Sequence, residues 1–169
     1  MALATGAQLA RLGHRVVYGG ASVGLMGAVA DGALDAGGEV VGVLPTDLVQ
    51  RELAHEGLTE LVEVASMHER KREMFERSDA FVALPGGFGT LEEVLEIATW
   101  TQLGHHDKPV LVMNHDGFYD PLLAQIERAI DWGVMRAENR DIIRVVETPA
   151  ELGTAIATYE RSSVPKWVN

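Results

Sequence analysis

The sequence feature that most constrains this chain is a glycine-rich stretch, Pro85-Gly86-Gly87-Phe88-Gly89-Thr90-Leu91-Glu92-Glu93. Residues 79–84, which precede it, form a short and almost wholly apolar run, as is typical of a buried strand. Beyond it, Leu91, Val94, Leu95 and Ala98 recur at helical spacing, and this pattern predicts a helix that reaches Leu103. The stretch therefore predicts a strand, a tight turn and a helix in direct succession.

The predicted turn has the properties of an anion site. Its three glycines allow positive φ angles and let a ligand approach the bare main chain. The amides of the turn and of the first helical turn would point at one spot, where the helix dipole adds positive charge. For a small acidic protein we interpret this anion as a phosphate. A structural alternative stays open, because Thr90 and Glu93 also have the spacing of a helix capping box.

Composition limits the classes of partner. The chain has 169 residues, which we expect to form a single domain over residues 1–169. Fourteen Lys and Arg against 25 Asp and Glu give a formal charge of −11, so nucleic-acid polymers and anionic membranes are poor partners. A mononucleotide can still be held locally by amides and a few cations. We expect a cytoplasmic protein, because neither a signal peptide nor a membrane-spanning run is visible.

Apolar strands and helical segments alternate along the chain, which predicts an α/β fold with a doubly wound parallel sheet and helices on both faces. A second glycine-rich turn, containing Gly19, Gly20 and Gly24, follows a strand in the same way. Segment 46–57 is polar and irregular, and holds Glu52 and His55. The expected strands are residues 14–18, 39–45, 60–64, 79–84, 109–113 and 142–146. The expected helices are residues 2–12, a helix that ends at residue 36, one that begins at residue 66, one that ends at residue 103, and residues 119–132 and 149–159.

The start of the sequence departs from this plan. A doubly wound sheet normally opens with a strand, whereas the sequence as written opens inside a helix. Loss of a central strand would leave buried backbone groups unpaired on both neighbours, at about 1–3 kcal/mol each. We therefore expect either that the neighbouring strands close up or that the natural protein begins upstream with a strand.

Two cations lie on the inward side of the helix that follows Ser66. At 100° per residue, Met67, Met74 and Phe75 define its apolar side, with Lys71 inside that arc and Arg70 at its edge. Inward cations are costly unless an anion meets them. A phosphorylated ligand is one such anion. The alternative is a lysine that extends to solvent and an arginine paired with a structural carboxylate.

Glu93 is the carboxylate best placed for chemistry. On the predicted helix it lines up with Ile97 and Trp100, opposite the apolar stripe that begins at Leu91. A helix with two apolar lines is buried on both, so Glu93 should face a cleft or a second subunit. One turn from a phosphate cradle, it is placed for acid–base work or for stabilising positive charge. The line of Ile97 and Trp100 also predicts a dimer that buries both residues.

Three motifs resemble those of the LOG (Lonely Guy) family, in older records often labelled lysine decarboxylases. These are the stretch from Pro85 to Glu93, the run Met67-His68-Glu69-Arg70-Lys71, and the second turn from Tyr18 to Gly27. Residues 99–104 and 108–109 extend the resemblance over nearly the whole chain. The family's opening strand and its Cys-Gly-Ser-Ser turn have no counterpart here.

The resemblance implies a Rossmann-like homodimer that hydrolyses cytokinin-type adenosine 5′-monophosphates, which carry an N6 side chain, to the free base and ribose 5-phosphate. It implies no cofactor, and the sequence holds no histidine or acidic cluster with metal-ligand spacing. AMP is a further candidate substrate, and a non-catalytic nucleotide carrier on the same fold is the alternative. Carried over by position, the catalytic pair is Arg70 and Glu93, and the substrate contacts are Glu52, Lys71, Gly87, Phe88, Gly89, Thr90, Leu91, Glu92 and Thr99.

Overall fold

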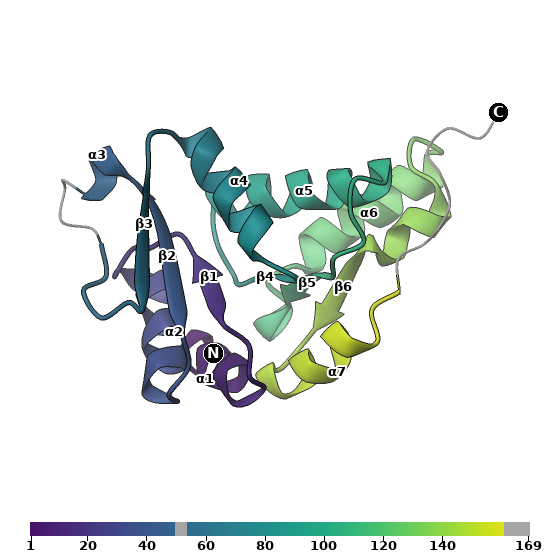
Figure 1. Ribbon diagram of the computed structural model, residues 1–169. Coiled ribbons are helices and arrows are strands. Elements are labelled where there is room, and N and C mark those ends of the chain that lie inside the picture. Colours follow the sequence, from purple (N-terminus) through teal and green to yellow (C-terminus); the bar gives the residue numbers. More distant parts are fainter. Residues whose placement is uncertain (50–53, 161–169) are drawn as a thin grey trace. The chain divides into compact units, whose positions relative to one another are not determined.

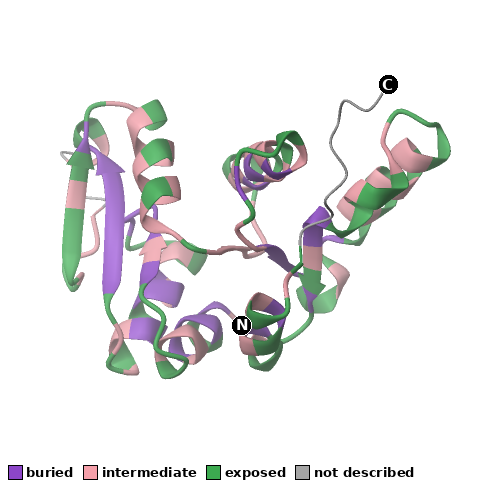
Figure 2. Cartoon of the chain, turned by 45° about the vertical axis from the view of Figure 1, so that its right-hand side comes forward, coloured by how far each residue is buried: buried purple, intermediate pink, exposed green. Residues whose placement is uncertain are grey.

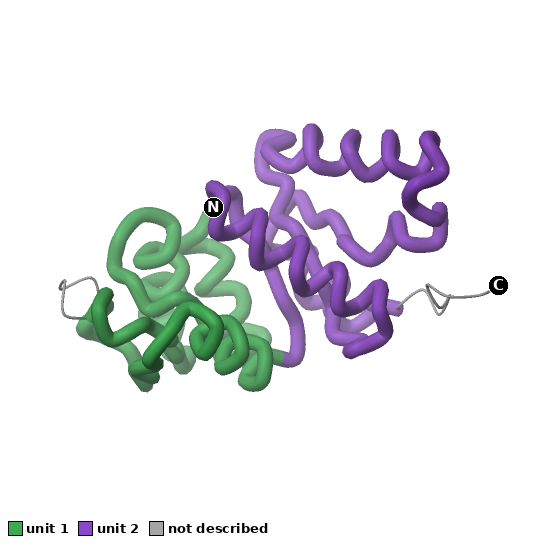
Figure 3. The backbone as a smooth tube through the Cα atoms, turned by 90° about the horizontal axis from the view of Figure 1, so that it is seen from above, with its two compact units in different colours: residues 1–78 green, residues 79–169 purple. Residues whose placement is uncertain are grey.

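The computed structural model describes residues 1–49 and 54–160. It divides into two compact units, Met1–Ser78 and Asp79–Asn169 (Figure 3). Each unit contains a parallel three-stranded sheet with helices packed against it. The expected α/β class with parallel strands is therefore confirmed, while the single domain expected over residues 1–169 stays a prediction.

The first unit alternates helices and strands from its first residues (Figure 1). Its sheet has the order β1-β2-β3, and both strand pairs are parallel. The strands are β1 (Val16–Tyr18), β2 (Val40–Pro45) and β3 (Glu60–Val64), and the helices are α1 (Ala2–Arg11), α2 (Gly24–Asp35), α3 (Thr46–Val49) and α4 (Met67–Arg77).

Strand β2 forms the centre of this unit. All six of its residues are buried, whereas most of β3 is exposed (Figure 2). Both α2 and α4 contact β2, so an almost entirely apolar strand loses its contact with water. Helices α1 and α2 pack backbone to backbone, because a Cβ on Gly6 would lie 2.0 Å from the carbonyl oxygen of Val29.

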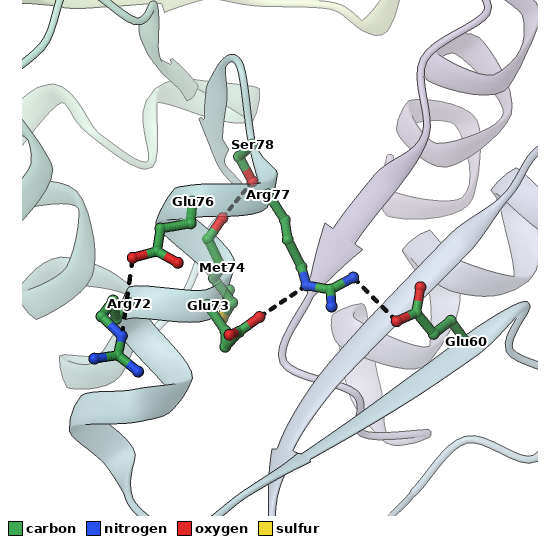
Figure 4. Close-up of polar contacts among 7 residues, drawn as sticks. All are labelled: Glu60, Arg72, Glu73, Met74, Glu76, Arg77 and Ser78. Carbon is green, nitrogen blue, oxygen red and sulfur yellow. Dashed lines mark hydrogen bonds and ion pairs between the residues drawn. The ribbon is translucent and has the colours of Figure 1, made fainter.

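Helix α4 is fixed at both ends. At its start, the Ser66 hydroxyl accepts from the amide of Glu69 (3.2 Å), and the Glu69 carboxylate accepts from the amide of Ala65 (2.8 Å), the residue before the N-cap, in a variant of the capping box. At its end, Arg77 donates to Glu73 (2.9 Å) on the same helix and to Glu60 (3.0 Å) on β3 (Figure 4). These bonds set the position of α4 on the sheet.

The second unit has the sheet order β4-β5-β6, again all parallel. Strand β5 is buried along its length. The strands are β4 (Phe81–Ala83), β5 (Val110–Met113) and β6 (Ile143–Val146); the α-helices are α5 (Phe88–Leu103), α6 (Asp120–Asp131) and α7 (Leu152–Ala157); and the 3-10 helices are η1 (His115–Gly117), η2 (Ala137–Ile142) and η3 (Pro149–Glu151).

The chain differs from the sequence-based expectation in two places. Segment 46–57 was expected to be irregular, and its first four residues form α3. The strands form two three-stranded sheets where we expected one, with β1 and β4 each at the end of its own sheet in the described residues. None of the helices in this described part is long and apolar enough to cross a membrane.

Candidate active site

The glycine-rich stretch runs from β4 into α5 as the sequence predicts, and its helix starts with glycine. Gly87 is the N-cap residue and makes no side-chain capping bond, and the first helical bond joins the Leu91 amide to the Gly87 carbonyl (3.0 Å). Thr90 is the third residue of the helix, so Thr90 and Glu93 are not the capping box at its start. The amides of the first turn therefore donate no hydrogen bond to an N-cap side chain, which leaves them able to donate to an anion.

This first turn of α5 is open to solvent. Phe88 is 93% exposed, and Gly87 and Gly89 are exposed as well. Thr90 folds back over the turn, because a Cβ on Gly86 would lie 2.2 Å from the Thr90 hydroxyl oxygen. A ligand can thus reach the backbone of Gly87, Phe88 and Gly89 directly.

The buried residues of helix α5 come from both expected apolar lines. Val94 of the core stripe and Ile97 of the second line are buried, together with Thr101, whereas Leu95 of the core stripe is 43% exposed. The buried side also makes a contact that helical periodicity does not contain. The buried His106 ring packs against the helix at Ile97 and Thr101, with its Nε2 3.1 Å from the Ile97 carbonyl oxygen and 3.2 Å from the Thr101 hydroxyl.

Two predicted site residues of α5 lie on different sides of the helix. Glu93 is half-buried and lies about 20° from Trp100 around the axis, whereas Thr99 lies about 120° away from Glu93. Thr99 is exposed, and its hydroxyl donates to the Leu95 carbonyl (2.7 Å). It also lies about 16 Å along the axis from Phe88. Within this unit the structure does not bring Thr99 to the glycine cradle.

In the first unit, Arg70 points toward the sheet. Its Nε donates to the carbonyl of Val43 on β2 (3.1 Å). Its guanidinium also lies against the second glycine-rich turn, because a Cβ on Gly19 would be only 1.7 Å from Nη2. Gly19 therefore leaves the space that this guanidinium occupies. The inward orientation of Arg70 predicted from the helix is confirmed.

The second glycine-rich turn packs against β2. Gly20 and Gly24 have positive φ angles of 78° and 59°, which glycine adopts without strain. The Gly20 Cα lies so close to β2 that a Cβ on Gly42 would be 2.7 Å from it. The Tyr18 hydroxyl donates to the Ala21 carbonyl (3.2 Å), and burial, with a smaller effect of Asp31, raises the pKa of this tyrosine. The turn is thus held tightly against the sheet.

The other predicted residues are placed as follows. Lys71 is half-buried on α4, and Met67, expected on its apolar side, is 49% exposed. Glu52 lies outside the described residues. Among the residues that are described, no three histidine or acidic side chains gather in a way that could hold a metal ion. Arg70 belongs to the first unit and Glu93 to the second, and their pairing stays a prediction.

Comparison with known proteins assigns the chain to a family. A family model described as "Possible lysine decarboxylase" matches residues 26–156. A probable cytokinin riboside 5′-monophosphate phosphoribohydrolase of Oryza sativa subsp. japonica is 49% identical over 161 residues, which are 95% of this chain and 72% of that protein. A cytokinin riboside 5′-monophosphate phosphoribohydrolase of Arabidopsis thaliana is 50% identical over 144 residues, which are 85% of this chain and 67% of that protein.

The chain belongs to the LOG family. A second rice member, named LOG itself, is 48% identical over 158 residues, and there the match spans 65% of the relative's length. The resemblance inferred from the three motifs is confirmed.

Solved structures support the fold. The molybdenum cofactor binding protein of Rippkaea orientalis is 25% identical to this LOG family member, with a TM-score of 0.69 over 93% of this chain and 86% of that chain. The molybdenum cofactor carrier protein of Chlamydomonas reinhardtii is 23% identical, with a TM-score of 0.67 over 94% of this chain and 85% of that chain. At the latter identity the likeness concerns the fold alone.

Proposed function

We propose that this chain hydrolyses the N-glycosidic bond of adenosine 5′-monophosphates that carry an N6 side chain, and releases the free base and ribose 5-phosphate. The observation that carries this proposal is the identity of 48–50% with cytokinin riboside 5′-monophosphate phosphoribohydrolases. The chain spans 65–72% of the length of these relatives.

The glycine-rich stretch supports binding of the 5′-phosphate. The start of α5 has exposed glycines, no capping bond from its N-cap residue, and the positive end of a 16-residue helix dipole. In this proposal Gly87, Phe88, Gly89, Thr90, Leu91 and Glu92 hold the nucleotide, together with Lys71, Thr99 and Glu52. The second turn contributes differently: Gly19 and Gly20 are buried and Gly19 borders Arg70, whereas Gly24 is exposed and could meet a ligand.

Charge development determines the roles of Arg70 and Glu93. Cleavage of the glycosidic bond leaves a sugar with oxocarbenium character and an electron-rich base. The Glu93 carboxylate would stabilise the positive sugar and orient the attacking water. Arg70, already anchored to the Val43 carbonyl, would hold the substrate in register with that carboxylate. Both groups act more strongly on the transition state than on the bound nucleotide.

We also propose that the protein works as a homodimer in the cytoplasm. Thr99 supports the dimer, because it is distant from the cradle on its own helix and lies beside an apolar groove of α5. A second copy covering this groove would give Thr99 a site in which to act.

A carrier function is the second candidate, favoured by the likeness to the molybdenum cofactor binding protein of Rippkaea orientalis. Such a protein would bind a phosphorylated ligand without turnover. The presence of both Arg70 and Glu93 favours hydrolysis.

Product analysis distinguishes the two candidates. The purified chain is incubated with N6-isopentenyl-AMP and, separately, with AMP, and the products are separated by chromatography. We expect isopentenyladenine and ribose 5-phosphate in equal amounts from the first substrate. A chain that binds the nucleotide but returns it intact after many hours would support the carrier. Adenine release from AMP, compared at equal concentration, measures how much the N6 side chain contributes.

A further inference from the structure

A short segment beyond the second glycine-rich turn returns to contact that turn. Ala54 forms an isolated antiparallel bridge with Ala21, and the His55 amide donates to the Gly20 carbonyl (3.0 Å). Together with the Tyr18 hydroxyl bond to Ala21, this means that two successive carbonyls of the turn have protein donors. The turn is therefore held from the side of β1 and from the side of residues 54–57.

The His55 side chain joins this segment to helix α2. Its Nδ1 accepts from the amide of Gly57 (3.0 Å), and its Nε2 lies 2.9 Å from the Asp31 carboxylate. A backbone amide can only donate, so Nδ1 carries no proton and Nε2–H donates to Asp31. The neutral ring satisfies both bonds at once. The His55 side chain is 12% exposed, whereas that of Asp31 is 56% exposed.

The turn that His55 holds also contacts the Arg70 guanidinium and limits where it can lie. Gly19 lies against the guanidinium, with no room for a methyl group between them. Gly20, whose carbonyl His55 engages, lies directly on Gly42 of β2. A displacement of this turn would open or close the space occupied by the Arg70 guanidinium. A chain of direct contacts thus runs from Asp31 through His55 and the turn to Arg70.

We propose that His55 and Asp31 are a positioning pair, which holds the second glycine-rich turn against Arg70 so that both are in place for a ribose 5-phosphate group. Neither residue touches the substrate in this proposal. It rests on the proposed function for its effect on turnover. A purely stabilising role predicts instead a lower melting temperature with unchanged kcat/KM.

Four substitutions separate the two bonds of His55. His55→Asn retains an acceptor near the place of Nδ1, and His55→Gln retains a donor near the place of Nε2. His55→Ala removes both, and Asp31→Asn weakens the acceptor without removing it. Glu56→Gln is the matched control, since Glu56 is exposed on the same segment. Each variant is measured for kcat and KM with N6-isopentenyl-AMP, for affinity to ribose 5-phosphate by calorimetry, and for melting temperature.

We expect His55→Ala to lower kcat/KM about tenfold, consistent with the loss of two hydrogen bonds. His55→Asn, His55→Gln and Asp31→Asn should each lose about threefold, as one bond is lost or weakened. Glu56→Gln should behave as the wild type. In an Arg70→Ala background, His55→Ala should have almost no further effect, because the residue through which it acts is gone.

Three outcomes would overturn the proposed positioning role. These are an unchanged kcat/KM in His55→Ala, an equal loss of kcat/KM in Glu56→Gln, or effects of His55→Ala and Arg70→Ala on kcat/KM that are fully additive. If His55→Ala does not fold, the Asn, Gln and Asp31→Asn variants carry the test. If the wild type hydrolyses nothing, the proposed function fails, but weaker ribose 5-phosphate binding by the His55 variants would still support the positioning pair. A wild type that does not bind ribose 5-phosphate overturns both.

Discussion

Arg70 obtains its position from the main chain of two neighbouring elements. The Val43 carbonyl accepts from its Nε, and Gly19 leaves the space for its guanidinium. Arginine suits this place because its planar group presents several N–H donors in fixed directions, one of which meets the Val43 carbonyl. At the scale of one residue, the position of Arg70 therefore requires a glycine 51 positions earlier in the sequence.

This dependence can be tested with Gly19→Ala. The added methyl group would occupy the place of Nη2, so Arg70 must move away. We expect kcat/KM to fall at least tenfold, because a misplaced catalytic group loses its orientation. A double-mutant cycle with Arg70→Ala provides the control: Gly19→Ala should cost little more once the guanidinium is absent. Equal losses in both backgrounds would show that Gly19 is needed for another reason.

Glu93 carries the chemical step in the proposed mechanism. We expect Glu93→Gln to abolish turnover while nucleotide affinity stays within a few fold, because the amide keeps the shape but loses the charge that stabilises the sugar cation. Activity and calorimetric affinity are measured on the same preparation. Glu96→Gln, on the same helix and also half-buried, is the control. A large drop in melting temperature in Glu93→Gln, instead of a loss of turnover, would assign this carboxylate to the fold.

At the scale of elements, the helix starts differ in how they are capped. Helix α4 begins with side-chain bonds from both Ser66 and Glu69, whereas the N-cap residue of α5, Gly87, makes no side-chain capping bond. Helix termini need partners for their first amides. An uncapped, exposed start is consistent with an anion as the missing partner at α5, while α4 needs none.

The segment that leads into α7 has a capping arrangement of its own. Glu151 accepts from the Thr148 hydroxyl (2.7 Å) and from the Glu147 amide (3.1 Å), and these bonds, the hydroxyl first, lower its pKa. A lowered pKa means that the ionised form stabilises the fold. This contribution is complete above the pKa of the unfolded chain and is lost as the pH falls through the pKa of the folded state.

We therefore expect Glu151→Gln to lower the melting temperature at pH 7. The difference from the wild type should shrink below about pH 4, where the wild-type carboxyl becomes protonated. Thermal unfolding followed by circular dichroism at both pH values measures this. Glu138→Gln, which removes an exposed acidic residue in the first turn of η2, is the control for the loss of one negative charge. A constant difference at all pH values would assign the effect to packing.

At the scale of the whole molecule, the expected dimer stays a prediction, and only one of its two predicted contact residues is accessible. Ile97 is 5% exposed and so already buried within the chain, whereas Trp100 is half-buried. The apolar groove of the second unit lies on the other side of α5 and is lined in part by Leu95, Ala98, Met135 and Ile142. Association through this groove would cover the exposed Leu95 side chain and favour the dimer by removing apolar surface from water.

A single charge in this groove should dissociate the dimer. We expect the wild type to sediment as a dimer at micromolar concentration and Leu95→Glu to sediment as a monomer, because a buried carboxylate without a partner is costly. Leu103→Glu is the matched control: Leu103 is also an exposed leucine of α5, and it does not line the groove. A monomeric wild type would contradict the dimer, and an unchanged Leu95→Glu dimer would place its interface elsewhere.

The sequence alone determined most of the segments that become strands and helices, though not α3, and where the glycine turns lie. These features depend on residues close together in the chain, such as the apolar run at 79–84 and the glycines that end it. The inward direction of Arg70 also followed from its place on one helix. The three motifs were enough to indicate the family, because they lie in order along the chain.

Only the tertiary structure decided which side of α5 is buried, what anchors Arg70, and what His55 contacts. Each of these depends on a contact that helical or strand periodicity does not contain. His106 selects the side of α5, the Val43 carbonyl lies 27 residues before Arg70, and Asp31 lies 24 residues before His55. Periodicity gives the direction of a side chain on its own element, whereas packing decides which distant atom it meets.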